Sequence, residues 1–348
     1  MTGMFRKIFV VYPRGVRTGG PEALHQLVST LRTLGQDAYL VPRPGTESAE
    51  RVSAYDHYGA PEVSEFEDAS DNAVVTSEYI MTHLANVKKA TRFCWWLSID
   101  NSPVFKADRQ ALGLWETRAQ KQVQTSKFRT ISGLQSIRRS LNGQKRLIDS
   151  VNHLSQSEYA WSFLFTRLNV VSNMVSDYTP LTVLHAVQQL PPLERGRTIA
   201  FNPKKAARIT ELLKDNVKDA VFVPLVGMSP AGVASALGTT SIYLDLGYHP
   251  GKDRMPREAA ICGAVSLVAR RGSGAFYGDV PIPWEHKITA DKHILQRSVA
   301  AIERVFLNPE GNQQTQAFYR DRILSEKETF QSEVERTFVF GEFDSNRA

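Results

Sequence analysis

The stretch His249-Pro-Gly-Lys-Asp-Arg-Met-Pro-Arg-Glu-Ala-Ala-Ile-Cys-Gly263 is the most informative part of the chain. Two apolar runs flank it, Ser241–Gly247 and Ala264–Ala269, and we expect both to be buried strands. The stretch itself predicts a glycine-containing loop and a helix that opens at Arg257 and stops at Gly263. A loop between the carboxyl end of a strand and a helix N-terminus is where α/β folds bind ligands.

The charged side chains of this stretch indicate the kind of ligand. Lys252, Arg254 and Arg257 are cations, and with the positive end of the helix dipole they suit phosphate. Glu258 is a carboxylate in the expected first helical turn and suits a sugar hydroxyl. Together they predict a sugar nucleotide. The simpler alternatives are solvated loop cations and a glutamate placed only by the helix dipole.

Length and composition permit this prediction. A chain of 348 residues predicts two domains, and 42% hydrophobic with 22% charged residues is typical of a globular protein. The two cysteines, Cys94 and Cys262, lie in apolar runs, so neither a disulfide framework nor a metal cluster is expected. The N-terminus shows no signal-peptide pattern, and no apolar run approaches about 18 residues. We therefore expect a cytoplasmic protein.

Positive charge is concentrated in one segment. Residues 102–150 contain ten Lys/Arg and three acids, whereas the whole chain has a net charge of +6. The segment is either a solvated helical face or a surface for an anionic partner, such as membrane headgroups or a lipid-pyrophosphate acceptor. Nucleic acid is not expected, because no nucleic-acid motif is present and aromatic residues are not interleaved with the basic ones.

Short apolar strands alternate with helices through both halves of the chain, which predicts an α/β protein with two Rossmann-like, doubly wound parallel sheets. In the first half we expect strands at 7–12, 37–41, 72–76, 92–97 and 151–155, with a helix at 21–34. The second half restarts with strands at 197–201 and 220–224, and a long helix at 313–338 closes the chain. The predicted boundaries are an N-terminal domain at 1–170 with a basic helical insertion at about 102–150, a linker at 171–196, a C-terminal domain at 197–312 and a C-terminal segment at 313–348.

Two segments carry a resemblance to a known family. Gly19-Gly20 and the Leu-rich helix after it resemble the N-terminal signature of GT-B glycosyltransferases. The segment Asp253–Gly263 is similar to the second half of the retaining family-four signature, with matches at Pro256, Glu258, Ala259, Cys262 and Gly263. The resemblance runs nearly end to end. It implies a GT-B fold in which the N-terminal domain binds the acceptor, the C-terminal domain binds the nucleotide sugar, and the last helix crosses back.

One position departs from the family pattern. The family's first glutamate lies eight residues before the second, and here that position is Pro250, with His249 beside it. In such enzymes the first glutamate lies near the donor sugar and the second holds the nucleotide ribose. The resemblance therefore gives Glu258 the ribose role and leaves the other role unfilled. Retention or inversion stays open, and the extra cations are compatible with an acidic donor sugar.

The resemblance also implies further donor-binding residues. Lys204 and Lys205 follow the first strand of the second half, where the family places cations on the donor phosphates. Gly19 and Gly20 bring backbone N–H groups close to donor or acceptor. Ser273 and Gly274 belong to a Gly-Ser-Gly turn that the family places near the sugar. The structural alternatives are exposed lysines and ordinary strand–helix turns.

Three residues are candidates for catalysis. His249 could hydrogen-bond the donor or replace the missing glutamate, and a structural histidine is an equal alternative. Glu258 acts by holding the ribose. Asp100, or in its place Glu78, follows a predicted strand and could be the general base of an inverting mechanism.

The sequence therefore predicts a metal-independent glycosyltransferase without a cofactor, whose donor is a nucleotide sugar. Its acceptor would be a glycan or lipid-linked glycan in cell-surface polysaccharide synthesis, with peripheral contact to the inner face of the membrane through residues 102–150. Two alternatives stay open: a non-catalytic GT-B-like partner subunit that binds a sugar or nucleotide, and a sugar-nucleotide epimerase. The donor sugar, the acceptor, the linkage and the oligomeric state are not predicted.

Overall fold

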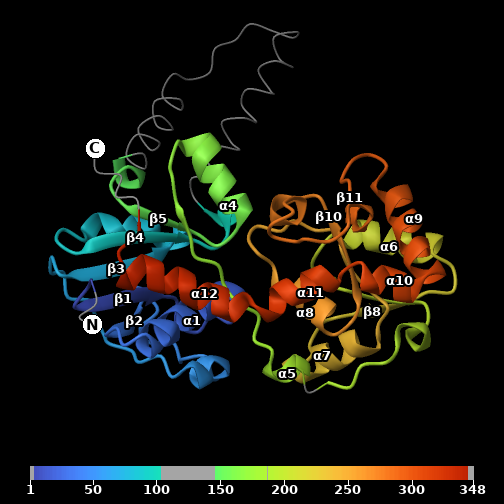
Figure 1. Ribbon diagram of the computed structural model, residues 1–348, viewed down its shortest axis with the longest axis horizontal. Helices are drawn as coiled ribbons and strands as arrows, with labels where there is room; N and C mark the ends of the chain where they lie inside the picture. The colour runs from blue at the N-terminus through green and yellow to red at the C-terminus, as the bar shows by residue number, and fades with distance from the viewer. Residues whose placement is uncertain (1–3, 103–145, 186, 344–348) are drawn as a thin grey trace, which may run out of the picture. The chain divides into compact units, whose positions relative to one another are not determined.

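The computed structural model describes residues 4–102, 146–185 and 187–343 (Figure 1). The chain divides into two compact units. Unit 1 consists of Met1–Gln156, Ala160–Val175 and Gln331–Ala348, and unit 2 consists of Ser157–Tyr159 and Ser176–Phe330. The basic insertion predicted at about 102–150 falls almost entirely on residues 103–145, which lie outside the described residues. No helix in the described part of the chain is long and apolar enough to cross a membrane.

Unit 1 contains a six-stranded sheet in the order β2-β1-β3-β4-β5-β6, and every strand pair is parallel. Five of the strands agree with the predicted ones within two residues at either end. The short sixth strand was not predicted. The strands are β1 (Lys7–Tyr12), β2 (Ala38–Pro42), β3 (Asn72–Ser77), β4 (Thr91–Trp96), β5 (Asn152–Ser155) and β6 (Asn173–Met174). Figure 1 shows β3, β4 and β5 side by side.

Helix α1 (Gly19–Thr33) connects β1 to β2 and is buried on its apolar face. Leu24, Leu27, Val28 and Leu31 recur at helical spacing, and each is at most 1% exposed. The helix ends before Gly35, whose φ of +76° is a left-handed conformation that favours glycine. The pattern Gly-Gly, Leu-rich helix, Leu-Gly in the sequence thus sets both ends of the helix. A shorter helix, α4 (Glu158–Phe163), follows β5.

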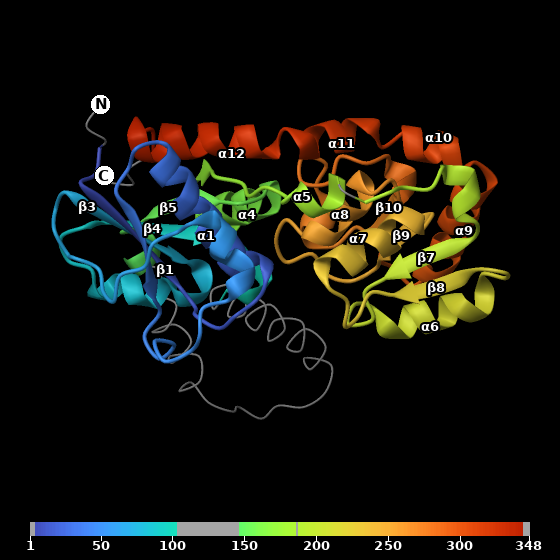
Figure 2. The same cartoon turned by 90° about the horizontal axis from the view of Figure 1, so that it is seen from below.

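Unit 2 contains a five-stranded parallel sheet in the order β11-β10-β9-β7-β8. Figure 2 shows β7 beside β8 and α7 beside α8. The strands are β7 (Thr198–Phe201), β8 (Val221–Pro224), β9 (Ile242–Asp245), β10 (Val265–Ala269) and β11 (Lys287–Ile288). The helices are α5 (Thr182–His185), α6 (Ala207–Asn216), α7 (Pro230–Thr239), α8 (Arg254–Ile261), α9 (Ile294–Leu307), α10 (Pro309–Gln314) and α11 (Ala317–Leu324). Helix α12 (Glu326–Val334) begins in unit 2 and ends in unit 1.

Successive residues of β9 face two separate cores. Ile242 and Leu244 lie in a cluster with residues of α6 and α9. Tyr243, between them, lies in a cluster with residues of α7, α8 and α11. Because successive side chains of a strand point to opposite faces, helices cover both faces of this sheet. This is the doubly wound arrangement that the alternating pattern predicts.

The C-terminal helix differs from the prediction. One helix was expected at 313–338, but the structure contains α10, α11, α12 and a π-helical turn at Glu335–Val339. The first break is at Gln316, where the backbone leaves helical geometry (φ −97°, ψ 13°). The Gln316 amide bonds both the N–H and the carbonyl of Ser266 in β10, at 3.1 and 2.9 Å. The break thus coincides with a side-chain contact to a distant strand, which a periodicity argument cannot detect.

The unit boundaries also differ from the predicted domain boundaries. Residues 171–175 of the expected linker belong to unit 1, and 176–196 belong to unit 2, where Leu184 lies in the core. Residues 313–330 belong to unit 2 as well. In unit 1, the Phe338 ring lies 5.1 Å from that of Phe93, so the last helical residues join the unit 1 core.

Candidate functional site

The order of strands in unit 2 creates a switch point between β7 and β9. After β7 the chain adds β8 on one side, and then returns to place β9 on the other side. In open α/β sheets ligands bind beyond the carboxyl ends of the strands at such a point. The loops there comprise residues 202–206 after β7 and 246–253 after β9, and the adjacent loop 270–276 follows β10. Most of the predicted unit 2 site residues lie in these three loops.

Lys205 joins the first two loops through ion pairs. Its Nζ lies 3.0 Å from Asp245 Oδ2 and also donates to Asp253 Oδ2. Burial alone would lower the pKa of Lys205, but the carboxylates of Asp253 and Asp245 raise it above the usual value. Asp245 is further held by the Tyr243 hydroxyl at 3.1 Å and the Gly247 N–H at 3.1 Å. Lys205, predicted to bind phosphate, is instead engaged by two carboxylates of its own unit.

His249 lies completely buried beneath the same loops. Its Nδ1 is 2.9 Å from Asp253 Oδ2 and its Nε2 is 3.6 Å from Asp245 Oδ1, although neither nitrogen makes a hydrogen bond of good geometry. Its carbonyl accepts the Ser273 N–H at 2.9 Å. With no exposed surface, His249 is placed to organise the loop rather than to contact a donor sugar.

The Gly-Ser-Gly turn packs directly on His249. Gly272 has a φ of +54°, and a Cβ there would lie 2.0 Å from the His249 carbonyl oxygen. A Cβ at Gly274 would lie 2.6 Å from the Ala269 carbonyl oxygen and 2.9 Å from the His249 ring. Ser273 is fully buried, and its hydroxyl donates to the Gly251 carbonyl. The close packing explains both glycines, and it makes Ser273 and Gly274 part of the loop's support.

Helix α8 begins earlier than predicted, at Arg254 rather than Arg257. Asp253 occupies the N-cap position but makes no side-chain capping bond, because it pairs with Lys205. Glu258 therefore lies in the second turn and is partly exposed, and Arg254 donates to its Oε1 at 3.0 Å. Glu258 and Arg254 thus stand together beside the loops, with 14% and 29% of their side chains exposed.

Arg257, predicted to bind phosphate, occupies a different position. Its guanidinium is fully buried and lies 2.9 Å from Asp177 and 3.0 Å from Glu326. Burial alone would lower the pKa of Arg257, but these two carboxylates raise it. We therefore assign Arg257 a structural role, since no part of its side chain reaches the surface. It connects α8 to the segment entering unit 2 and to the start of α12.

Lys252 and Lys204 complete the predicted cations. Lys252 lies 2.9 Å from Glu326 Oε1, and 13% of its side chain is exposed. Lys204 is exposed, and among the residues that the structure describes its ammonium makes no ion pair. Asn202 fixes the backbone there by accepting the Lys204 N–H at 3.0 Å. Lys204 is thus the predicted phosphate ligand whose ammonium stays available.

The remaining predicted residues lie in unit 1. Gly19 and Gly20 are the first residues of α1, and Thr18 before them makes no side-chain cap. The first backbone N–H groups of a helix have no partner within the helix. Asp100 lies in a short 3₁₀ helix, Ile99–Asn101, after β4 and is partly exposed. The roles of Gly19, Gly20 and Asp100 stay predictions.

Glu78 has the most unusual environment of the carboxylates considered. It follows β3, is 3% exposed, and accepts the Leu97 N–H at 2.9 Å. Burial raises the pKa of Glu78 to about 7, although bonds to backbone N–H groups oppose the shift. A carboxylate that titrates near neutrality suits a general base, but its burial keeps it from solvent.

Sequence reasoning missed two acids. Asp245 ends the apolar strand β9 with a completely buried side chain, and Asp253 lies in the quoted stretch without an assigned role. A charged residue directly at the carboxyl end of a buried strand is the signal that could have identified Asp245.

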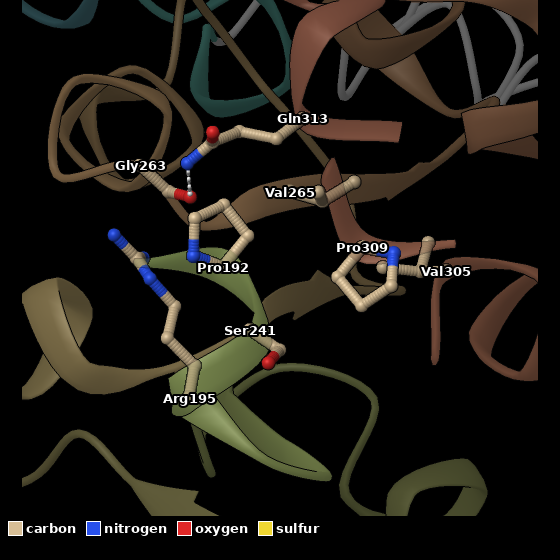
Figure 3. A pocket seen from close by; sticks show the side chains of 8 residues that line it. All are labelled: Pro192, Arg195, Ser241, Gly263, Val265, Val305, Pro309 and Gln313. Atoms are coloured by element: carbon tan, nitrogen blue, oxygen red, sulfur yellow. Dashed lines mark hydrogen bonds between the residues drawn. The ribbon is translucent and has the colours of Figure 1, made fainter. Parts of the chain in front are cut away.

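A small pocket with a cavity volume of about 10 Å³ lies away from these loops, at the amino ends of β9 and β10 (Figure 3). Arg195 lines this pocket. Its guanidinium donates to the carbonyls of Leu237, Thr240 and Cys262, which lie at the C-terminal ends of α7 and α8. Figure 3 shows Gln313 donating to the Gly263 carbonyl. A cation at two helix C-termini is a stabilising arrangement, and the pocket is smaller than most ligand sites. We therefore regard it as structural.

Comparison with known proteins supports the architecture. No protein-family model matches the chain, and a search of curated proteins found no significant match. Among solved structures, a sucrose-phosphate synthase from Thermosynechococcus elongatus aligns with a TM-score of 0.60 at 12% identity, over 95% of this chain and 98% of that chain. Anabaena HepE, solved with UDP-glucose, aligns with a TM-score of 0.60 at 10% identity, over the same shares of the two chains.

The glycotransferase of kitacinnamycin aligns with a TM-score of 0.53 at 12% identity, over 96% of this chain and 99% of that chain. At such identities a structural match establishes the fold. The two parallel-sheet units and these matches together confirm the prediction: the chain has the two-domain Rossmann-like GT-B fold.

Proposed function

We propose that this protein is a glycosyltransferase that takes its sugar from a nucleotide-sugar donor bound at the carboxyl ends of β7, β9 and β10. One observation carries the proposal. Three loops that are far apart in sequence, 202–206, 246–253 and 270–276, meet at the switch point of a GT-B-type unit. They bring together the available ammonium of Lys204 and the N-terminus of α8, which carries the carboxylate of Glu258. HepE, of the same fold, was solved with UDP-glucose.

In this proposal the donor phosphates are held by Lys204 and by backbone N–H groups at the start of α8. The ammonium of Lys204 is exposed beside the switch point, and a helix N-terminus favours an anion through its dipole and free N–H groups. Cations at this place would stabilise the departing nucleotide diphosphate. Transfer would then need no metal cofactor.

Glu258 is the proposed ribose ligand. Its carboxylate is partly exposed and is oriented by Arg254, its neighbour one turn earlier on α8. A carboxylate accepts hydrogen bonds from two adjacent hydroxyls, as the ribose ring presents them. The acceptor would bind unit 1 near Gly19 and Gly20, with Asp100 as the candidate base.

The finer assignments are proposals of the same kind. A glycan or lipid-linked glycan acceptor agrees with the basic composition of residues 102–150, which would contact anionic lipid at the inner face of a membrane. Cell-surface polysaccharide synthesis is the pathway that fits such an acceptor.

The test is binding followed by transfer. Purified protein is screened by thermal shift against UDP, GDP, CMP and dTDP, and the matching nucleotide should raise the melting temperature by mass action. Glu258→Gln should melt like the wild type and bind that nucleotide about tenfold or more weakly, because a hydrogen bond to a charged group is lost.

Release of nucleotide from the sugar-linked form, with product formed on an added acceptor, supports the transferase. Binding without turnover would instead favour the non-catalytic partner, for which Pro250 at the family's first glutamate position is the motivating observation. If none of the four nucleotides shifts the melting temperature, the donor site is wrong.

A further inference from the structure

We infer that Lys205 is a positioning residue, whose ammonium is the internal cation that holds loop 246–253 and the first turn of α8. The inference rests on the proposed function, because it concerns how the same site orients Glu258 toward a ribose. It also separates two adjacent lysines that the sequence treats alike. Lys204 faces solvent and would bind phosphate, whereas Lys205 builds the loop.

The ligand atoms around Lys205 form a cation site. Asp245, His249 and Asp253 each offer one ligand atom, and these atoms all lie within 4.8 Å of one another. Carboxylate and imidazole groups so close together are typical of a site for a divalent cation. Here the position is taken by Lys205, whose Nζ is 3.0 Å from Asp245 and also pairs with Asp253. The protein thus supplies its own cation.

Electrostatics support this assignment. The side chain of Asp245 is completely buried and that of Asp253 is 24% exposed. Two carboxylates at this separation repel each other unless a cation lies between them. Although burial alone would raise the pKa of Asp253, His249 and Lys205 hold it below the usual value. Lys205 Nζ contacts both carboxylates and so holds Asp245 and Asp253 together.

Gly247 provides an independent observation. A Cβ at this residue would lie 2.8 Å from Lys205 Cβ and 3.0 Å from both Cγ and Cδ. The backbone dihedral of Gly247 is not in the left-handed region, so conformational freedom does not explain the glycine. The lack of a side chain here lets the Lys205 stem pass beneath the loop. Gly247 and Lys205 thus depend on each other: the glycine leaves the space that the lysine stem occupies.

The packing of Lys205 against Gly247 and Asp253 also controls the position of Glu258 on α8. Asp253 is the N-cap of α8, and Glu258 pairs with Arg254 on the next turn. Releasing Asp253 from Lys205 frees the start of the helix and the loop before it. A displacement of about 1 Å is enough to weaken an oriented contact severely. Loss of Lys205 should therefore reduce recognition of the ribose more than recognition of the phosphates.

The test compares ribose recognition in Lys205→Met and Lys204→Met. Titrations use UDP and GDP, each with its 2′-deoxy counterpart. The wild type should prefer the ribonucleotide about tenfold, the value of one hydrogen bond to a charged group. Lys205→Met should reduce the preference below about threefold. Lys204→Met, the matched control, should weaken both forms equally and leave the preference unchanged.

Gly247→Ala is a second variant for the case in which Lys205→Met fails to fold, and it should lose the preference in the same way. If a folded Lys205→Met or Gly247→Ala protein keeps the full ribose preference, the positioning role is overturned while the donor site stands. If the wild type shows no preference, or binds neither nucleotide, the inference is overturned. The proposed function is removed as well only if none of UDP, GDP, CMP and dTDP binds.

Discussion

At the scale of single residues, neighbouring side chains of the same type have different roles. Lys204 faces solvent, while Lys205 is paired with two acids. On α8, Arg254 stands partly exposed beside Glu258, while Arg257 is completely buried. Charge alone does not distinguish the members of either pair. What distinguishes them is that Lys205 and Arg257 have partners on other loops and helices.

Glu78 provides a residue-scale prediction. Burial raises the pKa of Glu78 to about 7 from 4.5, so the folded protein binds a proton here that the unfolded chain releases. Its contribution is therefore most favourable below about pH 4.5 and is lost as pH rises through 7, by about 3 kcal/mol at most. Glu78→Gln cannot titrate, so it should become more stable relative to the wild type as pH rises.

Urea unfolding of both proteins at pH 5 and pH 8 checks this expectation. From pH 5 to pH 8, the unfolding free energy of the variant should rise relative to that of the wild type by 1 kcal/mol or more, which corresponds to about one pKa unit. An equal difference at the two pH values would contradict a neutral Glu78 in the folded state.

At the scale of elements, the Gly272–Ala275 turn shows how one loop supports another. Gly272 combines a positive φ with a carbonyl oxygen 2.0 Å from where a Cβ would stand. Gly45 also has a positive φ, of +85°, but nothing lies within 4 Å of its Cβ position. Comparing substitutions at these two glycines therefore separates the energetic cost of backbone strain from the cost of close packing.

Gly272→Ala should be the more destabilising of the two substitutions. Gly45→Ala should cost about 1 kcal/mol, the strain of a left-handed alanine. Gly272→Ala should cost about 1 to 3 kcal/mol more, because the turn or the His249 backbone must move as in an overpacked core. Denaturant unfolding measures both. Equal losses would show that the turn does not depend on contact with His249.

At the scale of the whole molecule, each unit has its own parallel sheet, and α12 contains the transition between them, with Phe330 in unit 2 and Gln331 in unit 1. The buried ion pairs of Arg257 with Asp177 and Glu326 lie within unit 2. They connect α8 to the segment around Asp177, where the chain enters unit 2, and to the start of α12, where it leaves unit 2. Their protonation should therefore influence the stability of that entire unit.

Unit 2 should lose stability in acid through Glu326. Burial alone would raise the pKa of Glu326, but Arg257 and Lys252 lower it to about 2 from 4.5. The ionised carboxylate therefore stabilises the folded state above about pH 4.5, and this contribution is lost as pH falls toward 2. Arg257→Met removes the main partner and should cost about 3 to 5 kcal/mol, because buried Asp177 loses its ion pair with Arg257 and Glu326 keeps only Lys252 as an ionic partner.

Calorimetry between pH 3 and pH 7 tests this. The variant should melt lower than the wild type at pH 7, and the gap should narrow toward pH 3 as the carboxyl groups that lost Arg257 take up protons. A gap that is independent of pH would indicate that Arg257 contributes by packing alone.

Most of the fold could be predicted from the sequence. The runs that became β1, β3, β7 and β10 read as strands because buried parallel strands are continuously apolar. The two-residue strands β6 and β11 and the breaks at Gln316 and Ser325 could not be predicted. Short elements and helix interruptions depend on side chains elsewhere, such as the Gln316 amide on Ser266.

The segments of the candidate site could be identified from the sequence: the stretch His249–Gly263, the lysines after β7 and the turn at Gly272. Local rules of strand, loop and helix are sufficient for that, because they act over a few residues. Which side chains face solvent became clear from the folded chain alone. It buried His249 and Arg257, paired Lys205 with Asp245 and Asp253, and left Lys204 exposed. Whether a charged side chain is exposed or paired depends on partners in distant loops, and the order of the strands in the sheet brings those loops together.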